Sequence, residues 1–282
     1  LTVKGGVSMI TKEYRVDGKV AIVTGAGRGI GKAIALTLAE AGADITVVAR
    51  TREQIEQTAE DIRKLGRKAL AIPADVSQED HVKKVVEQTV SQFGKIDILC
   101  NNAGITVRKP VALLPGAKMS VWGGTKDEPQ TLEEWHRVMD INLTSAFLFA
   151  QAVGPYMMKQ RRGKIINTSS TCADEGLPGI SAYSASKAGL STFTRCLASE
   201  WGPFNINVNA IAPGIIVTEM TADHFRDPKN TEAILARIPL GRFGEPRDVA
   251  LLVLFLAAEA SDYLTGQIFT IDGGAMGRGI GI

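Results

Sequence analysis

The sequence contains little cysteine and little histidine. Its 282 residues include three of each, the cysteines being Cys100, Cys172 and Cys196. This odd cysteine count, without Cys-x-x-Cys spacing, argues against a disulfide framework and a structural zinc site. We therefore expect a reduced, cytoplasmic protein that binds no metal.

Long apolar runs and a strong net charge are also absent. The longest apolar run, Val249–Ala258, is about half of what a membrane span requires, and the first ten residues lack the apolar core of a signal peptide. A net charge of +2 does not indicate a nucleic-acid surface. Without repeats or low-complexity linkers, we expect one domain over residues 17–282, after an extension of residues 1–16 in which Met9 is a candidate biological start.

Short β-rich apolar segments alternate with segments of helical periodicity. Strands are expected at Lys19–Thr24, Asp44–Arg50, Ala69–Pro73, Ile96–Asn101, Gly163–Ser169, Ile206–Ile211 and Gln267–Ile271. Helices are expected at Ile30–Ala41, Thr51–Leu65, Ser77–Phe93 with Ser77 as cap, Leu132–Lys159, Ala182–Glu200 and Val249–Ala258. Such alternation implies right-handed crossovers and a parallel sheet with helices on both faces. The sequence therefore predicts an α/β fold with a doubly wound sheet of about seven strands.

A glycine-rich segment, Thr24–Gly31, joins the first expected strand to the first expected helix. Glycines at this position let a pyrophosphate approach the free N–H groups of the helix N-terminus, which predicts a dinucleotide site. The glycine spacing, with Gly25, Gly29 and Gly31, resembles that of the short-chain dehydrogenase/reductase family, the branch with a Tyr-x-x-x-Lys motif. The resemblance extends from about Asp17 to Gly274 and implies a Rossmann fold.

The end of the second expected strand bears on the choice of nicotinamide cofactor. Sites selective for NAD place an acidic residue there, about 20 residues after the glycines, to accept the ribose 2′-OH. Here Arg50 occupies that position, and Arg28 lies within the glycine loop. Guanidinium groups suit a 2′-phosphate, so we expect NADP(H) rather than NAD(H). The alternative is that Arg50 and Arg52 only solvate a helix start, where a cation would oppose the helix dipole.

The resemblance implies further cofactor contacts along the chain. Asp75 and Val76 would contact adenine, and Asn102, Ala103 and Gly104 would pass beneath the ribose, whereas Asn101 would mainly stabilise the sheet. The segment with Pro213, Gly214, Ile216 and Thr218 would close over the nicotinamide, and Ile30, Tyr183 and Lys187 complete the expected set.

Tyr183 and Lys187 are four residues apart on an expected helix, so they share one face and reach one site. A nearby ammonium favours the phenolate of a tyrosine, whose ordinary pKa is about 10. Tyr183 can then exchange a proton with an alcohol or a carbonyl oxygen. Ser170, thirteen residues before Tyr183, matches the catalytic serine of the family. We expect strand alternation to point its neighbour, Ser169, to the opposite face.

Asn142 matches the asparagine that interrupts a helix in this family. The resemblance implies that it holds a water linking Lys187 to solvent. A purely structural role, as an amide that kinks the helix, is the alternative.

Two segments depart from the family pattern. Between Gly104 and Asn142 there are 37 residues, with a surplus around residues 109–131. We expect this insertion to border the substrate entrance or a subunit contact, the alternative being a surface decoration. After Ser170, the acidic Asp174 and Glu175 suggest a hydroxylated substrate such as a sugar or polyol derivative, unless they face solvent. Residues 217–240 are expected to form a substrate lid.

The sequence thus predicts an oxidoreductase that interconverts a secondary alcohol and a ketone with NADP(H). One alternative is the same reaction with NAD(H), and another is a catalytically idle, dinucleotide-sensing regulator. We expect a small-molecule substrate and no nucleic-acid or membrane partner. The resemblance implies a homotetramer.

Overall fold

Seven parallel strands form one sheet in the computed structural model, which describes residues 12–113 and 128–277. The strand order is β3-β2-β1-β4-β5-β6-β7. The strands are β1 (Val20–Thr24), β2 (Asp44–Ala49), β3 (Ala69–Pro73), β4 (Ile98–Asn101), β5 (Gly163–Thr168), β6 (Ile206–Pro213) and β7 (Ile268–Ile271). The predicted doubly wound α/β fold is confirmed.

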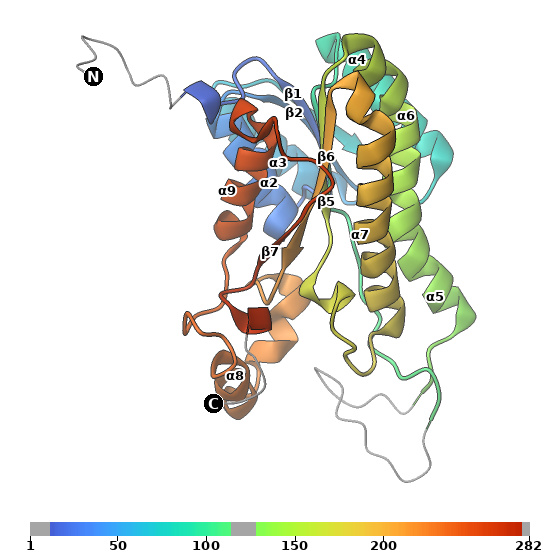
Figure 1. Ribbon diagram of the computed structural model, residues 1–282, viewed down its shortest axis with the longest axis vertical. Helices are drawn as coiled ribbons and strands as arrows, with labels where there is room; N and C mark the ends of the chain where they lie inside the picture. The colour runs from blue at the N-terminus through green and yellow to red at the C-terminus, as the bar shows by residue number, and fades with distance from the viewer. Residues whose placement is uncertain (1–11, 114–127, 278–282) are drawn as a thin grey trace, which may run out of the picture.

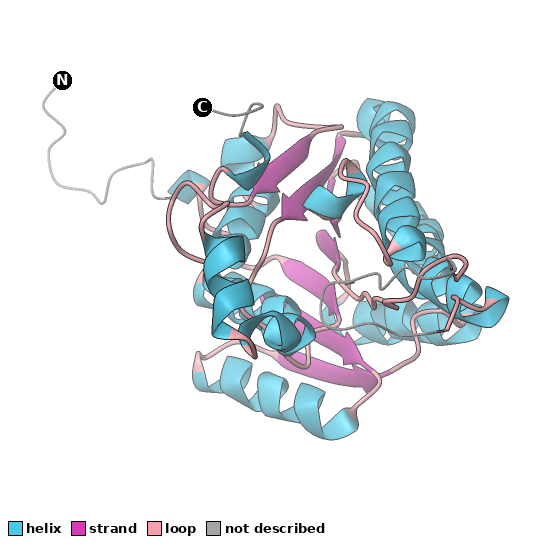
Figure 2. Ribbon diagram, turned by 90° about the horizontal axis from the view of Figure 1, so that it is seen from below, coloured by secondary structure: helices cyan, strands magenta, loops and turns pink. Residues whose placement is uncertain are grey.

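Helices cover both faces of the sheet (Figures 1 and 2). One layer contains α2 (Gly29–Glu40), α3 (Arg52–Lys64) and α9 (Pro246–Ala257), and the other contains α4 (Glu79–Phe93), α6 (Ser145–Gln160) and α7 (Ser181–Trp201). Each layer buries its own apolar cluster against the sheet. Because both faces are covered, all five residues of β1 are buried, which explains the continuous apolar runs in the sequence.

The strand order reverses between β1 and β4, which lie side by side although β2 and β3 come between them in sequence. In open α/β sheets, ligands bind at such a switch point, beyond the carboxyl ends of the strands. The short helices α5 (Leu132–Met139) and α8 (Pro228–Leu235) lie toward the lower end of the molecule in Figure 1. The fold therefore places the loops that follow β1, β4, β5 and β6 around one crevice.

Two details of the expected helices are wrong. The segment Leu132–Lys159 is not one continuous α-helix, because a π-helical turn at Asp140–Thr144 separates α5 from α6. Ser77 does not cap α4, whose N-cap is Gln78. The Ser77 hydroxyl instead donates to Asp75 Oδ1 at 2.7 Å, which holds the preceding turn. No helix among residues 12–113 and 128–277 is long and apolar enough to cross a membrane.

Both ends of the insertion are fixed by Lys109, although residues 114–127 lie outside the described part of the chain. The buried Lys109 ammonium lies 2.8 Å from Glu134 Oε1 and 3.3 Å from Glu128 Oε2. Its backbone N–H donates to Gly179 O at 2.8 Å, and Gln130 N donates to Pro110 O at 2.8 Å. The insertion therefore leaves and rejoins the domain beside the loop that follows β5. Whether its middle borders the substrate entrance stays a prediction.

Candidate active site

The glycine loop after β1 is locked onto the turn after β4. The Thr24 hydroxyl accepts hydrogen bonds from Asn102 N at 2.9 Å and Ala103 N at 3.0 Å. A Cβ on Gly25 would lie 3.0 Å from Ala103 Cα, and one on Gly31 would lie 2.2 Å from Gly25 O. The loop therefore requires glycine at both positions to fold this tightly.

The N-terminus of α2 fits a phosphate group. Its first turn contains no acidic residue, and the N-cap, Arg28, makes no side-chain capping hydrogen bond. The N–H groups of such a turn have no partner within the helix and carry partial positive charge. A pyrophosphate suits this position.

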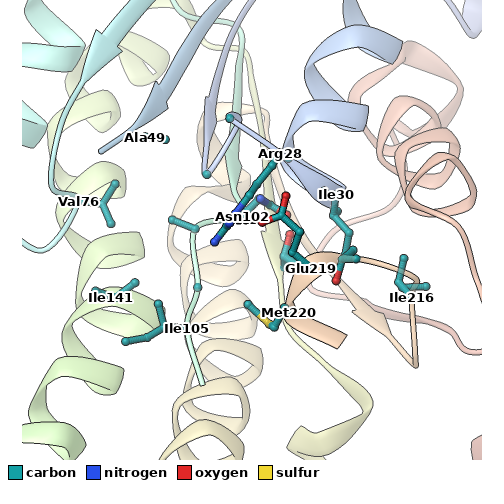
Figure 3. Close-up of a pocket in the computed structure, with 18 of the residues that line it drawn as sticks. Arg28, Ile30, Ala49, Val76, Asn102, Ile105, Ile141, Ile216, Glu219 and Met220 are labelled. Atoms are coloured by element: carbon teal, nitrogen blue, oxygen red, sulfur yellow. Dashed lines mark hydrogen bonds and ion pairs between the residues drawn. The ribbon is translucent and has the colours of Figure 1, made fainter. Parts of the chain in front are cut away.

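A cavity of about 320 Å³ extends from this turn along the carboxyl ends of the strands. All seventeen residues expected at the cofactor line it together with Ser170, and Figure 3 shows several of them. The expected residues in its wall are Gly25, Arg28, Gly29, Ile30, Gly31, Arg50, Asp75, Val76, Asn102, Ala103, Gly104, Tyr183, Lys187, Pro213, Gly214, Ile216 and Thr218. The structure thus brings the whole expected set to one place, and their contacts with a cofactor stay a prediction.

Tyr183 is one of these seventeen residues and is also the expected proton donor and acceptor. It lies in the first turn of α7, and Ser170 lies just beyond β5. Burial raises the pKa of Tyr183 to about 12, an effect that the Ser170 hydroxyl opposes. A pKa in this range keeps Tyr183 a neutral phenol at pH 7.

Lys187 lies one turn further along α7, beneath the tyrosine ring. Its Nζ is 5.7 Å from the ring centroid of Tyr183 and donates to Thr168 O at 2.6 Å. Burial lowers the pKa of Lys187 to about 8. The ammonium form still predominates at pH 7, so a positive charge lies within reach of the phenol and favours its deprotonated form.

Ser169 is held away from the reacting groups, as strand alternation predicts. Its hydroxyl lies 3.0 Å from Lys187 O and 2.7 Å from Ser191 Oγ. The Ser170 hydroxyl has a different environment: it accepts a hydrogen bond from Cys172 N at 3.2 Å, and Ser170 lines both cavities described below, whereas Ser169 lines only the larger one. That Ser170 contacts a reacting oxygen stays a prediction.

Asn142 lies in the π-helical turn, behind the cavity wall. Its side chain accepts from Ile105 N at 2.8 Å and donates to Ile105 O at 2.9 Å, and it also donates to Ser186 Oγ at 3.0 Å. A Cβ on Gly104 would lie 3.4 Å from both Asn142 Oδ1 and Lys187 Nζ. The structure thus places Asn142 near Lys187, and the expected water relay stays a prediction.

Arg50 lines the cavity, and its charge acts on Asp75. Burial raises the pKa of Asp75, but hydrogen bonds from Ser77 and the charge of Arg50 outweigh this effect, so the net shift is downward. Among the described residues, no hydrogen-bond or ion-pair partner engages the guanidinium of Arg50. Arg52, two residues further along the chain, has its guanidinium 3.9 Å from Glu56 Oε1 and does not line the cavity.

A second, smaller cavity of about 150 Å³ meets the first at Ser170 and Tyr183. Its wall includes Cys172 and Glu175 from the loop after β5, and Ile234 and Ile238 from the expected lid. Residues 217–240 therefore contribute to both cavities, which agrees with the place expected for a lid, although its movement stays a prediction. Asp174, in contrast, is exposed and lines neither cavity.

The sequence is similar over most of its length to a described enzyme family. A family model described as "Enoyl-(Acyl carrier protein) reductase" matches residues 25–276. The match includes the glycine loop, the turn after β4 and the Tyr183–Lys187 pair. This chain belongs to the short-chain dehydrogenase/reductase family. It is therefore an oxidoreductase of the class that uses a nicotinamide cofactor.

Relatives of known name cover nearly the whole chain. The 3-oxoacyl-[acyl-carrier-protein] reductase FabG of Thermotoga maritima is 42% identical over 260 residues, which are 92% of this chain and 98% of the relative. The 2-dehydro-3-deoxy-D-gluconate 5-dehydrogenase of Escherichia coli is 39% identical over 271 residues, 96% and 100% of the two chains. A gluconate 5-dehydrogenase from Burkholderia cenocepacia, solved in complex with NADP and tartrate, is 33% identical with a TM-score of 0.85, covering 96% and 100%.

One ion pair at the larger cavity was not predicted from the sequence. Arg28 of the glycine loop forms an ion pair with Glu219, the first residue of the 3-10 helix Glu219–Phe225 (Figure 3). Both residues line the larger cavity, so the pair crosses the space expected for the cofactor. The two residues are 191 positions apart, and no local motif could have indicated their contact.

The Glu219→Gln variant is expected to bind NADPH about two- to fivefold more tightly than the unchanged chain. The substitution releases Arg28 and removes a negative charge that would oppose the cofactor phosphates; exposed ion pairs contribute effects of this size. Fluorescence titration with NADPH measures the change. Glu232→Gln removes the same charge from exposed α8 and is the control. Weaker binding by Glu219→Gln alone would contradict the competition between Glu219 and the cofactor.

Proposed function

We propose that the protein interconverts a secondary alcohol and a ketone, with NADP(H) as cofactor and Tyr183 as the acid–base group. The observation that carries this proposal is the meeting of the two cavities at Ser170 and Tyr183. The larger cavity suits a dinucleotide, and the smaller one suits a substrate. Groups bound in the two cavities would therefore meet beside Tyr183, whose phenol is suited to proton transfer.

The residues of this chain can supply every step except the hydride transfer. The nicotinamide ring, when bound, supplies or accepts the hydride. In the direction of reduction, Tyr183 donates its proton to the carbonyl oxygen, and in the direction of oxidation its phenolate accepts the alcohol proton. The Ser170 hydroxyl orients the reacting oxygen and stabilises its developing charge. The Lys187 ammonium lowers the cost of the phenolate electrostatically.

The preference for NADP(H) rests on Arg28 and Arg50. Both guanidinium groups line one cavity, and the position that follows β2 carries Arg50 instead of the acidic residue that would accept a ribose hydroxyl. The relative from Burkholderia cenocepacia was solved with NADP. A 2′-phosphate would offer Arg50 the charged hydrogen-bond partner that the described residues do not provide.

We also propose that the chain forms a homotetramer through its long helices. α6 and α7 lie side by side in the outer layer (Figure 1). On that surface the half-exposed Phe147 contacts Phe193, with the ring centroids 6.4 Å apart. An aromatic pair on a helical face is typical of the central part of a subunit interface.

A direct assay that follows the absorbance of the nicotinamide cofactor tests the cofactor preference and the reaction together. Sugar acids, polyols, hydroxy acids, steroids and β-ketoacyl thioesters are supplied with each cofactor. We expect turnover that prefers NADP(H), and we expect Arg50→Gln to lower kcat/KM for NADP(H) about ten- to hundredfold through loss of charged hydrogen bonds. Arg52→Gln, which removes the same charge outside the cavity, is the matched control. Equal or better turnover with NAD(H) by the unchanged chain would overturn the cofactor proposal.

A further inference from the structure

The smaller cavity has an arginine at its wall that no described residue neutralises. Arg237 follows α8 and lines the cavity together with Tyr183 and Ser170. Among residues 12–113 and 128–277, no carboxylate lies within ion-pair distance of its guanidinium, and no hydrogen bond engages its side chain. A charged group beside the reacting centre, with its donors unused, is suited to an anion from the substrate.

The backbone at Arg237 is fixed in place by its neighbours. Ile234 and Ile238 are both buried, and Arg237 N donates to Ile234 O at 3.0 Å. A Cβ on Gly273 would lie 2.7 Å from Ile238 Cγ2, so Ile238 packs tightly against the turn after β7. Arg237 itself is exposed, so its guanidinium lies at the mouth of the cavity on a well-packed segment.

The other charged groups of the cavity leave room for an anion. Asp272 accepts from Gly274 N at 2.9 Å and Met276 N at 2.7 Å, one bond to each carboxylate oxygen, so the backbone offsets its charge. Arg108, on the same wall, donates to Met220 O at 3.2 Å and adds a second positive charge. Glu175 is the remaining acid of the cavity wall. Its carboxylate can only accept hydrogen bonds, so it suits the hydroxyl groups of a substrate, which can donate them.

The size of the cavity restricts the anion further. About 150 Å³ is below the range of roughly 300–1,000 Å³ that is common for pockets of drug-sized ligands. A short chain with a carboxylate at one end and hydroxyl groups along it matches both the volume and the polar wall. The phosphates of a thioester carrier lie far from its reacting carbonyl, so they would not reach a group that lines the same small cavity as Tyr183.

We propose that Arg237 binds the carboxylate of a short hydroxy acid and thereby makes the enzyme selective for anionic over neutral polyhydroxylated substrates. This inference rests on the proposed function, because it assumes that the reacting carbon lies at Tyr183. Arg237 contributes to substrate binding and takes no part in the proton or hydride transfer. Its removal should therefore raise KM while kcat changes little.

The test compares acids with neutral polyols of the same chain length, of which D-gluconate and D-glucitol are the first pair. Binding of each to the NADPH-loaded protein is measured by calorimetry, and turnover with NADP⁺ by absorbance. We expect the unchanged protein to bind the acid more tightly than the polyol. Arg237→Gln should weaken binding of the acid, and raise its KM, about tenfold, the loss of one charge-assisted hydrogen bond. The Arg237→Lys variant, which keeps the positive charge, should retain part of the affinity for the acid.

Lys229→Gln is the matched control, because it removes one positive charge from exposed α8 outside both cavities. Equal effects of Lys229→Gln and Arg237→Gln would show a general field effect and overturn the proposal. Binding of neutral polyols as tight as that of the acids, or a preference for acetoacetyl thioesters unaffected by Arg237→Gln, would overturn it as well. Acid binding that depends on Arg237 without any turnover would support this inference while the proposed reaction fails, so the two failures are distinguishable.

Discussion

Replacement of Tyr183 by phenylalanine is expected to lower kcat roughly 10³-fold, within the 10²–10⁴ range of acid–base catalysis. The variant keeps the ring and loses only the hydroxyl, whose proton the neighbouring Ser170 and Lys187 cannot supply from the same position. The affinity for NADPH should stay within about twofold, because we expect the loops after β1 and β4 to hold most of the cofactor. Steady-state turnover and fluorescence titration measure the two quantities.

Tyr263→Phe provides the control, since it makes the same chemical change at a fully exposed tyrosine that lines neither cavity. Its kcat should equal that of the unchanged chain. The Tyr183 variant also tests the alternative of a catalytically idle dinucleotide sensor. If the unchanged protein binds NADPH but turns over no substrate, and Tyr183→Phe changes nothing measurable, the sensor explains the molecule better. Persistent turnover by Tyr183→Phe would show that the proton transfer has been assigned to the wrong residue.

Replacement of Gly31 by alanine is expected to weaken NADPH binding at least tenfold and to lower the free energy of unfolding by roughly 1–3 kcal/mol, the usual cost of overpacking. The added Cβ would lie 2.2 Å from Gly25 O and 2.5 Å from Asn102 Nδ2. A backbone oxygen cannot move aside as a side chain can, so the glycine loop must shift, and with it the N–H groups that face the cofactor phosphates. Denaturant unfolding and NADPH titration measure the two effects.

Gly27→Ala is the matched control within the same loop. Its Cβ would lie 2.9 Å from Gln54 Oε1, which can rotate away, and 3.0 Å from Gln54 Cβ, which requires only a small shift of α3. We expect a markedly smaller loss of stability and of affinity from this variant. Equal losses from the two substitutions would mean that the loop tolerates no side chain at all, and that the close approach of Gly31 to Gly25 is not what limits it.

The sequence by itself determined the fold and the local motifs. The alternation of apolar strands with amphipathic helices requires a parallel sheet covered on both faces, because both element types must bury their apolar residues. The glycine loop and the Tyr183–Lys187 pair each lie within one turn or one helix, so their geometry follows from local backbone rules. Arg50 was equally predictable, because it directly follows a strand whose end is fixed by the sheet.

Only the tertiary structure decided how distant segments meet. The pairing of Arg28 with Glu219, the hydrogen bond from Lys187 to Thr168 O and the position of Arg237 beside Tyr183 all depend on loops at the carboxyl edge of the sheet. Such loops have no periodicity, and their conformations are set by packing against one another. The same holds for Asn142, whose amide is engaged by the backbone of Ile105 across two elements. Sequence patterns predict which residues each helix or strand buries. The smaller cavity, in contrast, is lined by side chains from several separate loops and helices.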